Sequence, residues 1–574
     1  MPKKLTLRKI LGVSLQQTRI LRNRYRKSEY RSWISSNYRT SRGSQIPQHV
    51  SVLMATYNTP VEFLKIAIES VRNQTCPNWE LSIVDDSSSS IETRSYLDSI
   101  SKTDSRIKVN LKSENSGISE TLNIAIAQSN GEFLGVLDHD DALHPRAIEL
   151  CLEAVKNNTG AILIYSDEDK IDKKGIHSNP FFKPDYSPEL LLSQMYLNHF
   201  TIMKSSEVKA IGGFRKEFDG AQDHDLALRL PLSKENVVHI KQVLYHWRAW
   251  EESTAMSIDA KPWAQTAAQR VQIEYMKSTG LGGTSVPSSI KGLNSIHWNI
   301  LGKPKVGVII PTASRRDPDS GGKQRLVDKC LDSLRSATGV SDIDICIVHT
   351  GSLESDQEFV YQNSGYKLVP YDKETFNFSH AVNLGVEALD AEFVLLLNDD
   401  TRIINPKSID YMVEYAQQKQ VGVVGAKLTF PNKRIQHAGM VSIGDLPTHP
   451  YYNASESEYG YYGSLLTPRN YLSVTAAAAM VRKEVFEEVS GFDEEFAHDF
   501  NDVDFCYRIH QAGYRNVWTP FAHFEHVEGA SIVRTRANPL ESELFLNRYQ
   551  GKFEPDPYYS PRLKQDIRRL YEFQ

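Results

Sequence analysis

The chain has 574 residues, of which 40% are hydrophobic and 24% are charged, and its formal net charge is −5. A chain of this length is too long for one hydrophobic core, and its ordinary composition excludes a fibrous or disordered protein. The small net charge gives no overall case for binding nucleic acid. The cysteines are odd in number and have no CxxC spacing, so we expect a reducing compartment and no structural zinc.

Residues 1–47 form a strongly basic segment in which Glu29 is the only acid. Its Lys and Arg residues alternate with aliphatic residues and with Tyr25, Tyr30 and Trp33. This pattern suits an anionic membrane surface, at about 1 kcal/mol per cation, and a solvated tail fits equally well. No apolar run approaches the about 20 residues of a membrane-spanning helix, and no signal peptide is recognisable. We therefore expect a cytoplasmic protein with peripheral contact to the inner face of the membrane.

The first globular unit, residues 48–257, alternates between strand and helix patterns. Strands are predicted at residues 50–55, 79–84, 107–111 and 131–137, and helices at residues 62–73 and 119–128. This order favours a mostly parallel, doubly wound α/β sheet. No GxGxxG follows the first strand and no GxxxxGK[ST] occurs anywhere, which disfavours a dinucleotide-dependent enzyme and a P-loop ATPase.

An apolar strand that ends in acids is the central feature of this unit. It reads Gly131-Glu-Phe-Leu-Gly-Val-Leu-Asp-His-Asp-Asp141, and Asp138 and Asp140 share one face if the strand geometry persists. Two carboxylates at the carboxyl end of a parallel strand suit a hard divalent cation, at the place where open α/β sheets bind ligands. An acidic loop that caps the next helix is the alternative.

Two later features of the unit carry candidate chemistry. Asp223 and Asp225 lie near a predicted helix start, where the helix dipole stabilises an ionised carboxylate that can serve as a general base. A simple N-cap is the alternative. His246, in the run Leu244-Tyr-His-Trp-Arg248, is a candidate ligand for a metal or a phosphate, or a packed histidine.

A connector, residues 258–304, precedes a second unit, residues 305–555, that repeats the plan of the first; residues 556–574 form a tail. Within the connector a helix is predicted at residues 262–277. In the second unit strands are predicted at 305–311, 343–348 and 391–397, and a helix at 378–389. Asn398 and Asp400 stand where Asp138 and Asp140 stood. Asp502 mirrors Asp223 and His526 mirrors His246. The aspartate and the histidine are 23 residues apart in the first unit and 24 residues apart in the second. Three features that recur in the same order indicate an internal duplication.

These residues resemble two family 2 glycosyltransferases of GT-A fold, joined in tandem. The second unit is similar to rhamnosyltransferase-like enzymes of O-antigen and capsule assembly. The resemblance in the first unit rests on Thr56-Tyr-Asn58, Val84-Asp-Asp86, Asp138-His-Asp-Asp141, Tyr165-Ser-Asp-Glu-Asp-Lys170, Phe182-Lys-Pro-Asp185 and Gln222-Asp-His-Asp225. In the second unit it rests on Phe376-Asn-Phe-Ser379, Leu397-Asn-Asp-Asp-Thr401, Ile435-Gln-His-Ala-Gly439 and Phe500-Asn-Asp-Val-Asp-Phe-Cys506.

The resemblance implies inverting transfer of a sugar from a UDP- or dTDP-linked donor to a lipid-linked oligosaccharide. It implies Mn²⁺ or Mg²⁺ as cofactor, which stabilises the departing diphosphate. Asp223 and Asp502 would be the general bases. The donor would be bound by Thr56, Asn58, Asp85, Asp86, Pro311 and His349. The metal would be held by Asp138, Asp140, His246, Asn398, Asp400 and His526.

The second unit departs from the pattern at its second strand, where Val348-His-Thr-Gly351 replaces Val84-Asp-Asp-Ser87. The acidic contact to the donor base is therefore absent there. Three hypotheses remain open at this point: a bifunctional enzyme of bacterial surface polysaccharide assembly, an enzyme with one non-catalytic glycan-binding unit, and a nucleotidyltransferase.

Overall fold

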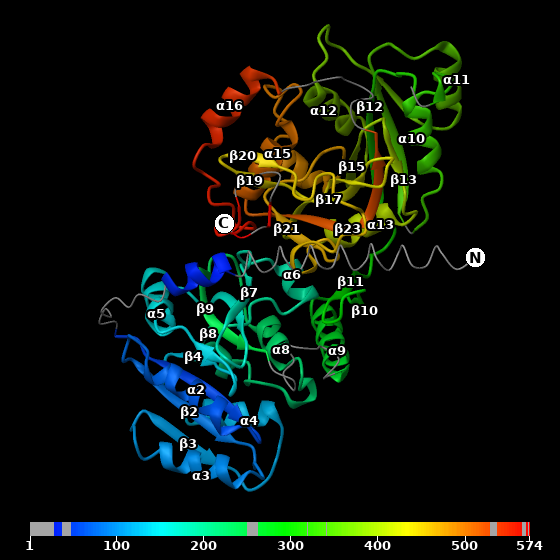
Figure 1. Cartoon of the computed structure of the whole chain (residues 1–574). Coiled ribbons are helices and arrows are strands. Elements are labelled where there is room, and N and C mark those ends of the chain that lie inside the picture. Colours follow the sequence, from blue (N-terminus) through cyan, green and yellow to red (C-terminus); the bar gives the residue numbers. More distant parts are fainter. Residues whose placement is uncertain are drawn as a thin grey trace, which may run out of the picture. The chain divides into compact units, whose positions relative to one another are not determined.

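The computed structural model describes residues 28–36, 47–249, 262–317, 320–339, 341–527, 537–564, 570–571 and 573. These residues form two compact units, each built on one large sheet flanked by helices (Figure 1). Unit 1 takes the described residues up to 186, those from 195 to 271, and residue 573. Unit 2 takes residues 187–194 and the described residues from 272 to 571.

The sheet of unit 1 has the strand order β3-β2-β1-β4-β8-β6-β9-β5, with β7 paired to β6. Strands β1, β2, β3 and β4 are parallel, whereas β8 runs antiparallel to both of its neighbours. The predicted α/β sheet is thus confirmed, and its second half is mixed. The strands are β1 (Val50–Thr56), β2 (Trp79–Asp85), β3 (Ile107–Leu111), β4 (Phe133–Val136), β5 (Ala142–Leu143), β6 (Leu163–Ile171), β7 (His177–Phe181), β8 (Thr201–Lys204) and β9 (Val237–Arg248).

The helices of unit 1 form where apolar residues recur at helical spacing. In α2 the buried residues Leu64, Ala67, Ile68 and Val71 lie on one face, which packs into the hydrophobic core of the unit. The helices are α2 (Val61–Arg72), α3 (Ile91–Ile100), α4 (Ile118–Ala127), α5 (Ala147–Asn157), α7 (Ser205–Ala210) and α8 (Gln222–Arg229).

The sheet of unit 2 repeats this plan in the order β14-β13-β12-β15-β22-β17-β23-β16. Position by position, its strands correspond to those of unit 1, which confirms the duplication seen in the sequence. The strands are β12 (Lys305–Thr312), β13 (Asp342–His349), β14 (Lys367–Pro370), β15 (Phe393–Leu397), β16 (Thr401–Ile403), β17 (Val421–Thr429), β18 (Ile435–His437), β21 (Arg469–Tyr471), β22 (Ala478–Arg482) and β23 (Arg515–His526). A separate hairpin joins β19 (Val441–Ile443) to β20 (Leu446–Thr448).

The helices of unit 2 likewise flank its sheet. Asn377 caps α12 by accepting a hydrogen bond from the backbone N–H of His380, which fixes where that helix begins. The helices are α10 (Leu326–Leu334), α11 (Ser355–Asn363), α12 (Phe378–Ala388), α13 (Ser408–Ala416), α14 (Lys483–Glu488), α15 (Asn501–Gln511) and α16 (Pro539–Tyr549).

Two segments from the middle of the chain also belong to unit 2. Helix α6 (Pro188–Ser193) packs on β21, where the Ser187 hydroxyl donates to Asn470 Oδ1 at 2.7 Å. The division between the units falls inside α9 (Pro262–Ser278). The two-stranded sheet of β10 (Gly283–Pro287) and β11 (Asn294–Trp298) follows and packs on α13.

Most of the basic segment, residues 1–47, lies outside the described residues. Residues 28–36 are helical and belong to unit 1, where Tyr30 is 2% exposed and its hydroxyl donates to Asp169 Oδ2 at 2.7 Å. Trp33 packs edge-on against Phe182. These two aromatic residues, predicted to suit a membrane surface, are thus engaged with the protein. No helix among the described residues combines the length and the apolar character needed to cross a bilayer.

Candidate functional site

The carboxyl ends of three parallel strands of unit 1 meet at one edge of its sheet. Strand β1 pairs in parallel with β2, which puts Thr56 opposite Asp85, and with β4, after which Asp138 follows two residues on. Ligands of open α/β sheets bind at this edge. The candidate residues on β1, β2 and the loop after β4 are therefore brought together by the strand order.

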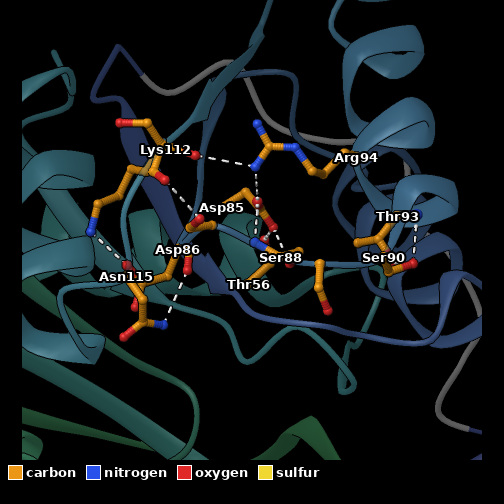
Figure 2. Close-up of polar contacts among 12 residues, drawn as sticks. Thr56, Asp85, Asp86, Ser88, Ser90, Thr93, Arg94, Lys112 and Asn115 are labelled. Carbon is orange, nitrogen blue, oxygen red and sulfur yellow. Dashed lines mark hydrogen bonds and ion pairs between the residues drawn. The ribbon is translucent and has the colours of Figure 1, made fainter.

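Asp85 is fully buried and bound by its own chain (Figure 2). Its Oδ1 accepts a hydrogen bond from Thr56 Oγ1 at 3.0 Å, and its Oδ2 accepts one from the backbone N–H of Ser88 at 2.9 Å. Arg94 adds an ion pair at 3.2 Å. Asn58 fixes the same loop, because its Oδ1 accepts from the backbone N–H of Ser89 at 2.8 Å.

Asp86 is held just as firmly on the other side of this loop (Figure 2). It accepts from the backbone N–H groups of Ser116 at 2.9 Å and Gly117 at 3.0 Å and forms an ion pair with Lys112. Burial opposes ionisation, but these contacts outweigh it and lower the pKa of Asp86. Asp86 is therefore an ionised acceptor, and both carboxylates are rigidly placed at the ligand-binding edge.

The acidic loop after β4 has two carboxylates that are partly exposed and one that is buried. The Asp138 side chain is 45% exposed and that of Asp140 is 15% exposed. Asp141 is buried and accepts from the Tyr245 hydroxyl at 2.6 Å and from the Arg248 backbone N–H at 2.7 Å. Burial, with the charges of Asp140 and Asp138, raises the pKa of Asp141 well above its ordinary value. Asp138 and Asp140 are thus the carboxylates of this loop that reach solvent, and Asp141 fastens the loop to β9.

Asp223 stands in the first turn of α8 and lines a small pocket together with Asn198 and His199. Burial, followed by the negative charge of Asp138, raises the pKa of Asp223 to about 6. A carboxylate with a pKa close to neutrality, in a pocket beside the acidic loop, has the properties of a general base.

Asp225 lies two residues further along α8 and has a different role. It is buried between two guanidinium groups, with Arg215 Nε at 3.1 Å and Arg229 Nη2 at 2.8 Å from its Oδ2. Arg229 in turn donates to the backbone carbonyls of Ile211 and Gly213. Asp225 therefore holds the loop before α8 in place, whereas Asp223 faces the pocket.

His199 is a candidate residue that the sequence analysis missed. Its backbone N–H donates to Glu168 Oε2 at 2.5 Å, its Nδ1 lies 3.3 Å from the same oxygen, and its Nε2 lies 3.9 Å from Asp138 Oδ2. Burial disfavours the charged ring, but Glu168, with Asp138 and Asp141, raises the pKa of His199 to about 9. The site thus contains an imidazolium next to the exposed carboxylate.

His246 has different partners from those the sequence predicted. Successive side chains on a strand point to opposite faces. Tyr245 stacks on His199 with ring centroids 4.6 Å apart, so His246 points to the other face of the sheet. There its Nδ1 lies 2.6 Å from Asp169 Oδ1, and His177 Nδ1 lies 2.8 Å from Asp169 Oδ2. The geometry therefore joins His246 to Asp169 and His177, so its role as a ligand beside Asp138 and Asp140 stays a prediction.

In unit 2 the corresponding strand ends meet in the same way. Pro311 and Thr312 end β12 opposite Val348 and His349 of β13, and Thr312 Oγ1 donates to Asp399 Oδ2 at 2.6 Å. Burial lowers the pKa of His349, so this residue is a neutral ring where unit 1 has the buried carboxylates.

The predicted metal ligands of unit 2 lie together around His526. Its Nε2 is 3.0 Å from Asp400 Oδ1 and 3.3 Å from Asn398 Nδ2, and its Nδ1 is 2.7 Å from Gln436 Oε1. Asp502 is in the first turn of α15, where its Oδ2 accepts from the Ala476 backbone N–H at 3.1 Å. Burial raises the pKa of Asp502, as it does for Asp223. Asp504 mirrors Asp225, because it binds Arg508 and Arg548.

Unit 2 lacks the counterpart of the His199–Glu168 pair. Lys204 pairs with Phe133 in unit 1, and Arg482 pairs with Phe393 in unit 2, so Lys204 and Arg482 are equivalent. Five residues before them lie His199 and Ala477, which are therefore equivalent as well. Leu163 pairs with Met203, and Val423 pairs with the equivalent residue Val481, so Leu163 and Val423 are equivalent. Five residues after them lie Glu168 and Leu428, which makes Leu428 the equivalent of Glu168. Both members of the pair are thus replaced together by apolar residues. The same comparison identifies the signal that could have indicated His199: two polar residues present in one repeat and apolar in the other.

Comparison with known proteins agrees with the two-unit architecture. Residues 51–211 match the family model described as "Glycosyl transferase family 2", and residues 304–538 match "Glycosyltransferase like family 2". An uncharacterised protein of Sinorhizobium fredii, y4gI, is 35% identical over 531 residues, which is 90% of this chain and 57% of that protein. The O-antigen biosynthesis protein RfbC of Myxococcus xanthus is 32% identical over 522 residues, which is 90% of this chain and 40% of that protein.

The chain thus spans about half the length of these two relatives. Among solved structures, S. aureus TarS 1–349 is 17% identical over 40% of this chain and 65% of that chain, with a TM-score of 0.32. That likeness is too slight to bear on the fold.

Proposed function

The chain belongs to glycosyltransferase family 2 and carries two domains of that family in tandem, and from this premise we propose that each unit transfers a sugar from a nucleotide-sugar donor to a glycan acceptor. The similarity to the O-antigen biosynthesis protein RfbC supports O-antigen or a related surface polysaccharide as the setting. A lipid-linked oligosaccharide is the proposed acceptor. Peripheral contact with the inner face of the cell membrane is proposed for the basic residues before residue 28.

The observation that carries the proposal is the environment of Asp223. Its carboxylate faces a pocket next to Asp138, with a pKa raised to about 6. In the proposed step Asp223 takes the proton of an acceptor hydroxyl while that oxygen bonds to the anomeric carbon. The bond from the anomeric carbon to the diphosphate oxygen breaks, and the nucleoside diphosphate leaves. One direct displacement inverts the anomeric carbon. Asp502 is proposed to act in the same way in unit 2.

The donor is proposed to lie across the ends of the parallel strands in each unit. In unit 1 the rigidly held carboxylates of Asp85 and Asp86 suit the hydrogen-bond donors of a uracil or thymine ring and of a ribose, beside Thr56 and Asn58. In unit 2 Pro311 and the neutral His349 take these places, so the same nucleotide would be held there by different contacts.

The residues after β4 and β15 fit a divalent cation. Asp138 and Asp140 present partly exposed carboxylate oxygens, a ligand type that Mn²⁺ and Mg²⁺ both accept. In unit 2, Asp400 Oδ1 is buried and has no hydrogen-bond partner among the described residues, although His526 Nε2 is 3.0 Å away. Asn398, Asp400 and His526 would hold the ion there, and an imidazole ligand favours Mn²⁺. When bound, the ion would neutralise charge on the departing diphosphate.

A second candidate function concerns unit 2 alone. Its lack of the acidic pair at the end of β13, together with Ala477 and Leu428 in place of His199 and Glu168, favours a unit that binds glycan without turnover. In that case unit 1 is the catalytic unit and unit 2 holds the growing chain.

The test is a linkage-resolved transfer assay on the full chain. Purified protein, Mn²⁺ and a panel of UDP-, dTDP- and GDP-sugars are incubated with acceptor glycans, and the linkages formed and their anomeric configuration are read by NMR. We expect Asp223→Asn to abolish one linkage and Asp502→Asn another, each variant serving as the control for the other. If Asp502→Asn forms every linkage of the wild type, the second candidate function holds. If both variants form every linkage, the assignment of the bases is wrong.

A further inference from the structure

A cavity of about 330 Å³ opens in unit 1 on the face of the sheet to which His246 points. This volume lies within the range of small-molecule sites in proteins. Five of the lining side chains are basic or can become so, and four are apolar. The lining comprises Lys173, Lys174, His177, His246 and Arg248, with Ile66, Ala142, Leu143, Ile171 and Gly175.

The residues that line the cavity differ in exposure, from exposed lysines to a buried histidine and a buried arginine. Lys173 and Lys174 are exposed, in the turn that joins β6 to β7. His246 and Arg248 are 2% and 1% exposed, next to the buried side chains of Leu143 and Ile171. Cationic groups are therefore present at both levels, which suits an anionic ligand that enters from solvent.

Asp169 fixes the two histidines of the cavity in one tautomer. An ionised carboxylate can only accept, so His246 Nδ1 at 2.6 Å and His177 Nδ1 at 2.8 Å must each donate a proton to it. The Tyr30 hydroxyl donates to Asp169 as well, at 2.7 Å. The cavity is lined by both imidazole rings but not by Asp169. Each ring is thus anchored at Nδ1 by Asp169.

We propose that this cavity binds a phosphoryl or diphosphoryl group. Lys173, Lys174 and Arg248 supply positive charge, and the two imidazole rings that Asp169 holds form part of the wall between them. The apolar walls leave room for an apolar or ring-bearing remainder of the ligand. Two sources share this chemistry: the diphosphate of an isoprenyl-linked acceptor and a free nucleoside diphosphate.

A divalent metal is the competing occupant, because ligand atoms of Asp169, His177 and His246 lie within 4.8 Å of one another. Two observations favour the anion. Both oxygens of Asp169 already accept hydrogen bonds, from three donors in all. Lys173, Lys174 and Arg248 line the adjoining cavity and repel a cation.

Arg248 connects the cavity to the donor side of the sheet. Its Nε donates to the Asp140 backbone carbonyl at 2.7 Å, and its backbone N–H donates to Asp141 Oδ1 at 2.7 Å. A ligand that engages the Arg248 guanidinium therefore contacts the residue that fastens the acidic loop. The proposed site is separate from the donor site, but Arg248 both lines the cavity and binds the acidic loop of the donor site.

Calorimetric titration of the full chain tests the proposal independently of any turnover. The titrant is inorganic pyrophosphate with EDTA present, and the protein carries Asp138→Asn and Asp140→Asn to remove binding at the donor site. We expect Lys173→Gln/Lys174→Gln to weaken binding about tenfold, as the loss of two nearby charges predicts. The control Lys156→Gln/Lys209→Gln removes two exposed lysines elsewhere in unit 1 and should leave affinity unchanged. Equal affinity in all three proteins overturns the proposal.

Two further arms identify the ligand. Tighter binding of geranyl diphosphate than of UDP assigns the site to an isoprenyl-linked acceptor, and the reverse order assigns it to a nucleotide; both orders support a diphosphate site. Without EDTA, one equivalent of Mn²⁺ or Zn²⁺ that copurifies and is lost in His177→Gln assigns the cluster to a metal and overturns the proposal.

Discussion

Replacing Asp223 with Asn should abolish transfer by unit 1 and at the same time make unit 1 more stable. Asn keeps the shape of the side chain and removes its charge. The ionised carboxylate that the proposed step needs is held in a buried pocket beside Asp138, an environment that opposes ionisation. Function and stability are therefore expected to change in opposite directions at this position.

The size of the stability gain follows from the pKa. The pKa of Asp223 is raised from 3.8 to about 6, and about two units at about 1.36 kcal/mol each give roughly 3 kcal/mol. The side chain keeps partial exposure, so we expect about 1–2 kcal/mol. Because this carboxyl pKa is raised, the penalty is full above pH 6, falls as the pH drops through 6, and is absent below about pH 4.

Thermal unfolding followed at pH 7.5 and pH 4.5 measures this difference. At pH 7.5 the unfolding transition of unit 1 should rise by about 2–8 °C in Asp223→Asn, and at pH 4.5 the gain should fall to about a third of that. The matched control is Asp225→Asn on the same helix, which leaves Arg215 and Arg229 without their carboxylate and should cost about 3 kcal/mol or more. If Asp223→Asn is destabilised like the control, Asp223 is a structural residue and its loss of activity says nothing about a base.

Three further predictions concern other groups. Glu168→Gln should lower the rate of the unit 1 linkage about 100-fold by misplacing His199 while the unit 2 linkage is unchanged, and equal losses in both linkages would contradict this. Burial opposes a charged His239, but Asp167 and Asp185 raise its pKa, so its contribution to stability is complete below pH 6.5 and is lost as the pH rises through the folded pKa. His239→Gln should therefore cost about 3 kcal/mol at pH 6 and less at pH 9, measured by thermal unfolding, and a cost that does not vary with pH would refute it. Chelation with EDTA should stop both linkages and Mn²⁺ should restore them; a linkage that survives chelation would show a metal-independent unit.

Much of the fold was predictable because its elements carry local periodicity. The helix predicted at 62–73 is α2 at Val61–Arg72, and the strand predicted at 79–84 is β2 at Trp79–Asp85. The antiparallel insertion of β8 between β4 and β6 was not predictable, since no local pattern in Thr201–Lys204 records which strands flank it. The same holds for α6, whose six residues pack in unit 2 although unit 1 surrounds them in sequence.

The acids of the site were visible in the sequence because they end apolar strands or begin helices. Asp138, Asp400, Asp223 and Asp502 all belong to such places. The partner of His246 was not visible, because the face on which a strand residue lies depends on a register set by pairing. A shift by one residue exchanges the faces, so His246 and Tyr245, adjacent in sequence, contact Asp169 and His199 on opposite sides of one sheet.

The differences between the two units argue that they use different donors. Both keep a half-buried aspartate at the start of the corresponding helix, with a raised pKa, so both keep the proposed base. They differ where the nucleotide would lie, with Asp85 and Asp86 in one unit and His349 in the other. A site that recognises hydrogen-bond donors through two fixed carboxylates cannot treat the same base equally once a neutral imidazole replaces them. We therefore expect a donor that saturates unit 1 to leave the unit 2 linkage unformed until a second nucleotide-sugar is added, and one donor that supplies both linkages at equal rates would refute this reasoning.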